Sequence, residues 1–338
     1  MRAVVYSQAG EPDVFHLVDR PLPEPGAGEV RVRVAVSGVN PTDWKARRGS
    51  TGEPVDPPVV PNQDGAGTVD AVGEGVDPSR IGERVWIWEA AWRRVDGTAQ
   101  EFVTLPERQA VPLTDGLSFD VGASLGIPAL TAQICLTASE SGPRRLRPDA
   151  LSGQTVLVAG GAGAVGHASI QLARWAGARV IATVSGDEKA KLAQAAGAQE
   201  IVNYRAAGAS EEILRLAPDG VDLVVEVAPA ANAALDAAVL AANGTVAAYA
   251  TDGGNEVGLS VRDLMGRNVR YRFVLVYTVP PAVKDAAVAD VAAAAAAGVL
   301  EVGAGAGLPL HRFPLEQAAA AHGAVEEGAV GKVLIDVA

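Results

Sequence analysis

The sequence predicts an α/β fold with two domains, and three observations support this prediction. A glycine-rich turn joins a buried strand to a helix within residues 155–176. From about Gly126 onward, apolar strand segments alternate with helical segments, which is typical of a doubly wound parallel sheet. The first 125 residues are instead rich in short strands and turns. A chain of 338 residues is long enough for two domains, each with its own core.

The expected strands of the N-terminal part are short apolar or alternating segments bounded by Gly, Pro and Asp. They are Ala3–Tyr6, Val30–Val36, Gly67–Val72 and Arg84–Trp88. The C-terminal residues 331–337 form another apolar strand, which follows a helix over Leu315–Glu327 and is expected to return to the first domain. The predicted first domain therefore contains residues 1–125 and 299–338, and residues 126–298 form the second.

The second domain is expected to alternate strands with helices along the chain. Its strands are predicted over Thr155–Ala159, Arg179–Val184, Glu200–Val202, Val221–Val227 and Thr245–Tyr249. Its helices are predicted over Asp187–Ala196, Ala230–Ala241 and Ala282–Ala297. A basic segment over residues 139–152 precedes the first of these strands and is expected to be a surface loop.

The glycine-rich turn predicts a dinucleotide site. Gly161, Gly163 and Gly166 stand in G-x-G-x-x-G spacing between the strand and the helix. Gly161 is expected to let the chain turn tightly, Gly163 to leave room for a pyrophosphate, and Gly166 to let the helix approach its strand. Free N–H groups and the helix dipole would then bind the phosphates at the helix N-terminus.

Composition excludes several classes of protein. Hydrophobic residues make up 49% of the chain and charged residues 20%, so the chain is globular. A net charge of −12 argues against nucleic acid or an anionic membrane as the main partner. Cys135 is the only cysteine, which excludes an intrachain disulfide and a cysteine-rich zinc site. The N-terminus lacks a signal-peptide pattern, so we expect a cytoplasmic protein.

The end of the second strand favours NADPH over NADH. NAD-specific sites usually carry an acid there for the ribose 2′-hydroxyl, whereas this chain has Ser185 and Gly186, with Lys189 one helical turn later. A hydroxyl, a glycine and a lysine suit a 2′-phosphate. Asp187 would be the NAD-type acid if the strand ran two residues longer, but we expect it to cap the following helix.

Four segments together resemble one family. They are the opening MRAVVYSQAG, then GVNPTDWKARRG, AGGAGAVG and the closing FPLEQAAAAHGAVEEGAVGKVLIDV. In this order they make the whole chain similar to the zinc-independent, zeta-crystallin-like quinone oxidoreductase branch of the medium-chain dehydrogenase/reductase superfamily. The resemblance implies a GroES-like β domain, a Rossmann domain, a homodimer, and NADPH-dependent reduction of quinones or α,β-unsaturated carbonyl compounds.

The resemblance also implies that the protein has no metal site. Asn40, Gln63 and Ile127 stand where zinc-dependent relatives have a cysteine, a histidine and a second cysteine. Two amides and an aliphatic side chain cannot replace those ligands. Without a Lewis acid, the protein is expected to reduce carbonyl systems that are already activated.

The predicted cofactor residues follow the glycine motif and the ends of successive strands. The resemblance adds Tyr204 beside the 2′-phosphate, the backbone of residues 273–275 beside the nicotinamide, and Lys332, for which a surface lysine is the alternative. The full set is Gly161, Ala162, Gly163, Ala164, Val165, Gly166, Ser185, Gly186, Lys189, Tyr204, Val227, Tyr249, Ala250, Thr251, Phe273, Val274, Leu275 and Lys332.

The predicted catalytic residues are Asn40, Asp43 and Thr131. Asn40 precedes a proline that fixes its backbone, and its amide is expected to donate to the substrate oxygen where charge develops. A turn asparagine bonding its own backbone is the alternative. Asp43 is expected to orient its neighbours, and the resemblance implies that Thr131 packs under the nicotinamide. Family members commonly have a tyrosine in the segment 48–53, which contains none here.

Three functions fit this sequence. The first is an NADPH-dependent quinone reductase, the second an enoyl or 2-alkenal reductase with the same hydride geometry, and the third a non-catalytic NADPH-binding protein. A homodimer is expected from the family and from the apolar run Tyr271–Val279, which suits edge-to-edge pairing of strands.

Overall fold

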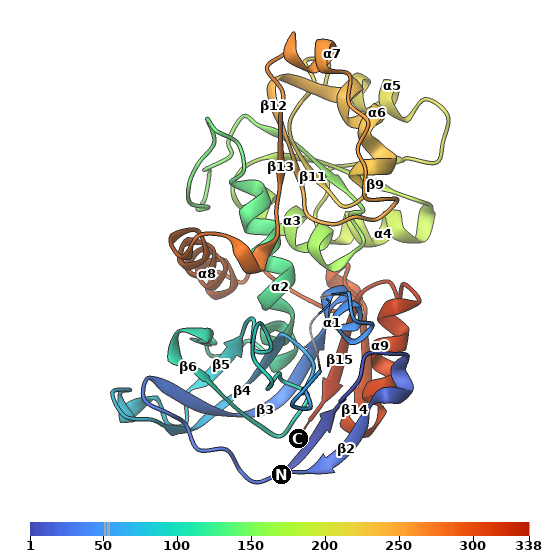
Figure 1. Cartoon of the computed structure of the whole chain (residues 1–338). Coiled ribbons are helices and arrows are strands. Elements are labelled where there is room, and N and C mark those ends of the chain that lie inside the picture. The colour runs from blue at the N-terminus through green and yellow to red at the C-terminus, as the bar shows by residue number, and fades with distance from the viewer. Residues whose placement is uncertain (51, 53–54, 338) are drawn as a thin grey trace. The chain divides into compact units, whose positions relative to one another are not determined.

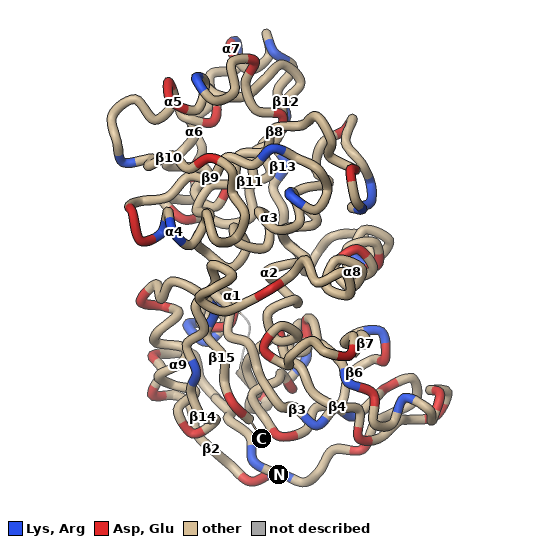
Figure 2. Tube along the Cα trace, turned by 180° about the vertical axis from the view of Figure 1, so that it is seen from behind, with Lys and Arg blue, Asp and Glu red and all other residues tan. Residues whose placement is uncertain are grey.

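The computed structural model describes residues 1–50, 52 and 55–337, and the chain folds into two compact units (Figure 1). The first unit contains Met1–Ile127 and Pro309–Ala338, and the second contains Pro128–Leu308. Acidic and basic residues are interspersed over both units (Figure 2). Each unit has its own sheet, as the sequence predicts.

The first unit is built on a seven-stranded sheet in the order β14-β15-β3-β4-β5-β7, with β6 also paired to β3. Its strands are β3 (Glu29–Val39), β4 (Asp64–Val72), β5 (Arg84–Ile87), β6 (Phe102–Pro106), β7 (Ala110–Pro112), β14 (Leu310–Pro314) and β15 (Lys332–Asp336), beside the hairpin pair β1 (Arg2–Val5) and β2 (His16–Asp19). The C-terminal β15 pairs antiparallel with β3, so that Leu334 lies opposite Gly38 (Figure 1). This pairing brings residues from both ends of the chain into one sheet.

Short helices surround this sheet. They are α1 (Pro41–Arg47), α9 (Ala318–Glu326) and the 3₁₀ turns η1 (Pro12–Val14), η2 (Pro78–Arg80), η3 (Glu107–Gln109) and η6 (Leu315–Gln317). The core between them contains Val32, Val34, Ile87 and Ile335, all without solvent exposure. At about 25 cal/mol for each Å² of apolar surface, this burial supplies most of the stabilisation of the unit.

The second unit is a six-stranded parallel sheet in the order β10-β9-β8-β11-β12-β13. The strands are β8 (Thr155–Ala159), β9 (Arg179–Val184), β10 (Glu200–Asn203), β11 (Val221–Glu226), β12 (Leu240–Ala248) and β13 (Arg270–Phe273). The helices are α3 (Ala164–Trp175), α4 (Asp187–Ala195), α5 (Ala209–Leu216), α6 (Pro229–Val239), α7 (Val261–Met265) and α8 (Pro281–Ala296), with 3₁₀ turns η4 (Val276–Thr278) and η5 (Ala304–Ala306). The strand order reverses between β8 and β11, which is the switch point where doubly wound sheets bind ligands.

The helix α2 (Phe119–Leu136) is the longest in the chain and contains Pro128. It is the one helix of the described residues that is long and apolar enough to cross a membrane, and 89% of that stretch is buried inside the protein. The sequence analysis did not predict this helix, because glycine and proline interrupt its pattern and it is apolar on all sides.

Several boundaries differ from the predictions. The apolar run Tyr271–Val279 is not one strand, because β13 ends at Phe273 and η4 follows. The helix predicted over Leu315–Glu327 starts as a 3₁₀ turn. Residues 299–308 belong to the second unit, where the Gln171 side chain bonds the backbone of Glu301 and His167 Nε2 lies 2.8 Å from Ala306 O.

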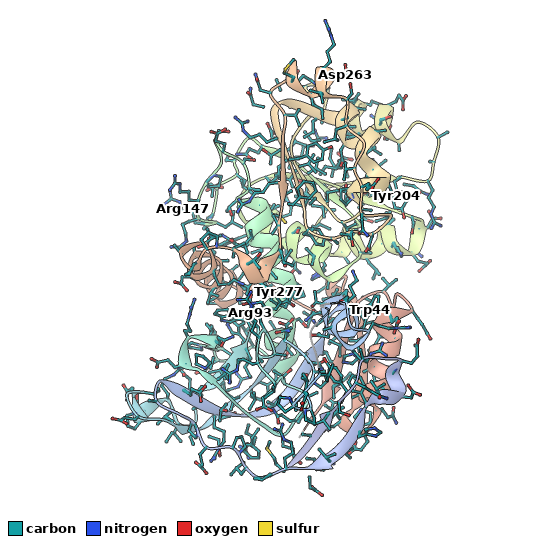
Figure 3. All side chains as sticks on the ribbon, viewed as in Figure 1. Trp44, Arg93, Arg147, Tyr204, Asp263 and Tyr277 are labelled. Carbon is teal, nitrogen blue, oxygen red and sulfur yellow. The ribbon has the colours of Figure 1, made fainter. Side chains whose placement is uncertain are left out.

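The basic loop over residues 139–152 is held against α8. The buried carboxylate of Asp290 accepts hydrogen bonds from Arg145 Nε at 2.6 Å, Leu146 N at 2.7 Å and Gln133 Nε2 at 2.8 Å. Arg147 of this loop lies at the surface of the second unit (Figure 3). One buried acid therefore holds a loop whose arginines are exposed.

Candidate functional site

The glycine turn after β8 is built as tightly as the sequence predicts, but the residue in the left-handed region differs. Gly160 has φ +70°, whereas we expected Gly161 to make the turn. Gly161 serves close packing instead, since an added Cβ would lie 2.8 Å from Ala182 Cβ. At Gly166 an added Cβ would lie 2.3 Å from Gly160 O, so this glycine lets α3 approach the turn.

The N-terminus of α3 suits an anion. Gly163 is its N-cap, and Ala164, Val165 and Gly166 form its first turn, so the side chains at this end are small and uncharged. The first N–H groups of a helix lack intrahelical partners and carry its positive dipole end. His167 is buried and bonded to Ala306 O, and burial lowers its pKa to about 4, which keeps it neutral and structural.

Seventeen of the eighteen predicted cofactor residues lie at the carboxyl edge of the parallel sheet. The residues of the glycine motif follow β8. The strand β9 is followed by Ser185, Gly186 and Lys189, β10 by Tyr204, β11 by Val227, and β12 by Tyr249, Ala250 and Thr251. The last strand, β13, ends with Phe273 and is followed by Val274 and Leu275. Val227 lies beside the turn, because a Cβ on Gly160 would come within 3.2 Å of its Cγ1. The topology thus gathers segments that are up to about 110 residues apart in the chain.

The end of β9 has the features of a 2′-phosphate site. β9 ends at Val184, and Gly186 is the N-cap of α4, so Asp187 is the first helical residue and not the cap that we predicted. The N–H of Tyr204 bonds Val184 O at 3.1 Å, which places Tyr204 beside this strand end. Its side chain is 43% exposed at the surface of the second unit (Figure 3). The guanidinium of Arg205, which the sequence analysis did not single out, lies 6.0 Å from the centroid of the Tyr204 ring.

A buried carboxyl pair supports the adjacent part of the edge. Glu226 Oε1 accepts hydrogen bonds from Ala228 N at 2.5 Å and Asn232 Nδ2 at 3.0 Å. Burial and the neighbouring Glu226 raise the pKa of Asp236 to about 9, so this pair holds a proton at neutral pH. The pair fixes the backbone that follows β11.

In the first unit, Asn40 and Asp43 are in direct contact. Asn40 has extended backbone, with φ −124° and ψ 160°, as expected before proline, and it is the N-cap of α1. Asp43 reaches back to this cap, since its Oδ2 accepts the hydrogen bond of Asn40 N at 2.7 Å. Burial, followed by the charge of Asp64, raises the pKa of Asp43 to about 8. Asp43 therefore fixes the backbone at Asn40.

The amide of Asn40 is held at both ends. Asn40 Nδ2 donates to Asp64 Oδ2 at 2.7 Å, and Asn40 Oδ1 accepts from Lys332 Nζ at 2.7 Å. Asp64 also accepts from Ile127 N at 2.8 Å and lies 3.5 Å from Lys332 Nζ. Burial raises the pKa of Asp64 and lowers the pKa of Lys332, although each is the counterion of the other.

Lys332 is the one predicted cofactor residue that lies outside the second unit. Its side chain is 2% exposed and its ammonium is bonded to Asn40, so it is not a surface lysine. The sequence could not reveal this partner, because Lys332 and Asn40 meet only through the pairing of β15 with β3.

The residues around Asn40 do not fit zinc. The Oδ1 atom of Asn40 accepts an ammonium hydrogen, Gln63 Oε1 accepts from Ala91 N at 3.1 Å, and Ile127 has no ligand atom in its side chain. Zinc prefers thiolate, imidazole and carboxylate ligands, and an ammonium beside them would repel it. In the part of the chain that the structure describes, His, Cys, Asp and Glu side chains do not gather into a group of three that could hold a metal ion.

Thr131 is the remaining predicted catalytic residue, and three tryptophans lie in the first unit. Thr131 is on α2 in the second unit and is 5% exposed. Trp86 and Trp88 are buried in the first unit and serve its core. Trp44, on α1, lies with its ring 5.7 Å from Lys45 Nζ (Figure 3). Of the segment 48–53, which lacks the family's tyrosine, residues 51 and 53 fall outside the described residues.

Comparison with known proteins finds two family models. "Alcohol dehydrogenase GroES-like domain" matches residues 26–115, and "Zinc-binding dehydrogenase" matches residues 164–293. The quinone oxidoreductase of Rattus norvegicus is 31% identical over 343 residues, which cover 99% of this chain and 97% of the relative.

Two solved structures are also similar over the whole chain. An NAD-dependent alcohol dehydrogenase superposes with a TM-score of 0.86 at 30% identity and covers 100% of both chains. A mycobacterial protein complexed with NADPH superposes with a TM-score of 0.82 at 29% identity and covers 99% of each chain. The fold is therefore a GroES-like β domain with a Rossmann domain, as the sequence predicts.

Proposed function

Because this chain belongs to the quinone oxidoreductase branch of the medium-chain dehydrogenase/reductase family, we propose that it reduces quinones with NADPH and without a metal ion. The observation that carries the proposal is the carboxyl edge of the parallel sheet. There the glycine turn after β8 leads into α3, whose N-terminus has no side-chain cap, and the neighbouring strand β9 ends without an acidic residue. We assign NADPH binding to this Rossmann domain and substrate binding to the GroES-like domain.

The preference for NADPH follows from charge at the end of β9. Ser185, Gly186 and Lys189 offer a hydroxyl, backbone N–H groups and a cation to a 2′-phosphate, and Tyr204 and Arg205 stand at the next strand end. A carboxylate in place of Ser185 would repel the phosphate by Coulomb interaction. The pyrophosphate would bind where Gly163 begins α3.

NADPH, when bound, supplies the hydride, and a quinone that takes up this hydride and one proton becomes a hydroquinone. The chain contributes orientation and a donor for the developing negative charge. We assign the donor role to Asn40, whose amide is held by Asp64, and the orienting role to Asp43, which fixes the Asn40 backbone. Thr131 is assigned to the nicotinamide face on the family resemblance alone.

We also propose that the protein is a homodimer in the cytoplasm. The edge strand β13 leaves one side unpaired in the sheet of this chain, and the apolar side chains of Phe273 and Leu275 beside it are 67% and 50% exposed. Unpaired edges favour strand addition from a symmetry mate. Sedimentation of wild type against Phe273→Pro, which removes an N–H on the side of β13 that faces away from β12, tests this assignment.

Oxidation of NADPH, followed by its absorbance, tests the proposed reaction. The acceptors are 1,4-benzoquinone, 9,10-phenanthrenequinone and a 2-alkenal, with NADH and a chelator as controls. We expect turnover with quinones that prefers NADPH and is unchanged by chelation.

The other outcomes separate the alternatives. Saturated aldehyde formed from the 2-alkenal, without quinone turnover, would identify an enoyl-type reductase. Tight NADPH binding with no turnover would identify a binding protein. Loss of turnover on chelation would contradict the metal-free reaction.

A further inference from the structure

The Lys332 side chain lies in a space that depends on the absence of a side chain at Gly38. Lys332 is the first residue of β15, and Leu334, two residues later, pairs with Gly38 of β3. A Cβ on Gly38 would lie 3.1 Å from Lys332 Cε, 3.2 Å from its Nζ and 2.2 Å from Ala123 O. A side chain at position 38 would therefore displace the lysine, so Gly38 is needed for this placement of the ammonium.

The Lys332 ammonium and the Asp64 carboxylate are both buried, and each stabilises the charge of the other. The neighbours of the ammonium are Asn40 Oδ1 at 2.7 Å and Asp64 Oδ2 at 3.5 Å. Lys332 and Asp64 have side chains that are 2% and 0% exposed. An isolated buried charge is costly, so each ion of this cluster depends on the others.

These contacts decide which way the Asn40 amide points. An ammonium only donates hydrogen bonds and a carboxylate only accepts them, so the amide oxygen must face Lys332 and the amide nitrogen Asp64. The hydrogen bonds among the described residues use one of the two Nδ2 hydrogens. A cation on the amide oxygen withdraws electron density from the nitrogen, which makes the second N–H a stronger donor.

We propose that Lys332 is a positioning residue for the reduction, because its buried ammonium holds the Asn40 amide with one N–H directed to the substrate oxygen. The inference rests on the proposed function. Lys332 supplies a fixed internal cation beside Asn40, which stands at one of the positions where zinc-dependent relatives have a metal ligand. It acts through Asn40 and does not bind NADPH.

A double-mutant cycle tests the proposal. Lys332→Met keeps the length of the side chain and removes the charge, Asn40→Ala removes the amide, and the double variant combines them. We expect each single change to lower kcat for quinone reduction by about 10- to 100-fold, which is less than the loss caused by removing a complete oxyanion-hole donor. The dissociation constant of NADPH should change by less than about threefold. The double variant should be no slower than the slower single variant, because both changes remove the same interaction. Lys191→Met, on the exposed face of α4, is the matched control and should retain wild-type kcat.

Two results would overturn the proposal. An NADPH dissociation constant at least tenfold weaker in Lys332→Met with unchanged kcat would make the lysine a cofactor residue. Losses of kcat that multiply in the double variant would make the two residues independent.

A readout on the wild-type protein keeps the proposal testable if Lys332→Met does not fold. In ¹⁵N NMR, the Asn40 side-chain amide, identified by its loss in Asn40→Ala, should shift as the Lys332 ammonium titrates, and one of its two hydrogens should exchange slowly. A pH-independent amide with two fast-exchanging hydrogens would refute the contact. If the wild-type protein binds NADPH but reduces no quinone, the proposed function fails, and this spectrum still decides whether Lys332 holds the amide.

Discussion

The glycine turn offers a paired test in which two alanine substitutions, three residues apart, should have different effects. In Gly166→Ala the new Cβ would lie 2.3 Å from Gly160 O and 3.0 Å from Gly161 Cα, which are backbone atoms that cannot rotate away. In Gly163→Ala the nearest atom is Gly160 O at 3.5 Å, which is ordinary contact, and the φ of −82° suits any residue.

The expected magnitudes follow from these distances. Overpacking of this kind costs about 1–3 kcal/mol, and the better helix propensity of alanine offsets up to about 1 kcal/mol. At roughly 2–4 °C for each kcal/mol, Gly166→Ala should lower the Tm by up to about 12 °C. Gly163→Ala should leave the Tm within about 4 °C, because Gly to Ala at an N-cap changes stability by about 1 kcal/mol or less.

The affinity for NADPH should distinguish a variant that only loses stability from one that loses the pyrophosphate site. The Cβ in Gly163→Ala would occupy the space expected for the pyrophosphate, so affinity should fall by about tenfold or more while the Tm holds. Gly166→Ala should lose both stability and affinity. Thermal unfolding and NADPH fluorescence titration measure the two quantities. Wild-type affinity in Gly163→Ala would refute the assignment of the pyrophosphate to this turn.

Three further predictions concern pH, cofactor choice and the basic loop. Burial lowers the pKa of His322 to about 3, so the unfolded chain takes up a proton first as pH falls below about 6.5, and stability is lost toward acid. In urea unfolding, the stability difference between wild type and His322→Gln should fall by about 2 kcal/mol between pH 7 and pH 5, and the same pH slope in both proteins would count against it. Ser185→Asp should lower kcat/KM for NADPH by about tenfold or more and favour NADH, and a variant that keeps its NADPH preference would contradict the 2′-phosphate site. Asp290→Asn should remove the anchor of Arg145 and cost about 1–3 kcal/mol, with faster tryptic cleavage in residues 139–152, whereas an unchanged cleavage rate would show that the loop is held otherwise.

The pH dependence of the first unit has a second, opposite contribution. The pKa of Asp43 is raised to about 8, so the folded protein keeps a proton that the unfolded chain releases near pH 4. The stability that Asp43 contributes is therefore present at low pH and is lost as pH rises toward 8. The two contributions cancel between about pH 4 and 6.5, and between pH 6.5 and 8 only that of Asp43 still changes, so together they place the stability maximum of this unit at mildly acidic pH.

The sequence alone predicted the architecture and most of the carboxyl edge. Strands, glycine turn and helices are signalled by local patterns, since apolar periodicity and glycine spacing act within about 20 residues. Once the strands are parallel, the residues after each strand must meet at one edge, which is why Ser185, Tyr204 and Val227 follow neighbouring strand ends as expected.

Local patterns failed where the outcome depended on packing. The left-handed residue of the turn is Gly160 and not Gly161, because the N–H groups of both residues converge on Thr183 O of the neighbouring strand. The helix α2 escaped prediction because it is buried on all sides and carries no amphipathic signal.

The contact of Lys332 with Asn40 was beyond any reading of the sequence. The two residues are separated by 292 positions, and each belongs to an unremarkable local segment. Only the antiparallel pairing of β15 with β3 brings the ammonium, the amide and the carboxylate of Asp64 together. The sequence by itself determined that this chain has a parallel sheet with a glycine turn, and that amide and aliphatic side chains stand at positions 40, 63 and 127. The tertiary structure decided which charge stands beside Asn40, because a buried ion settles where its counterions and hydrogen-bond partners converge, and that convergence is a property of the folded chain.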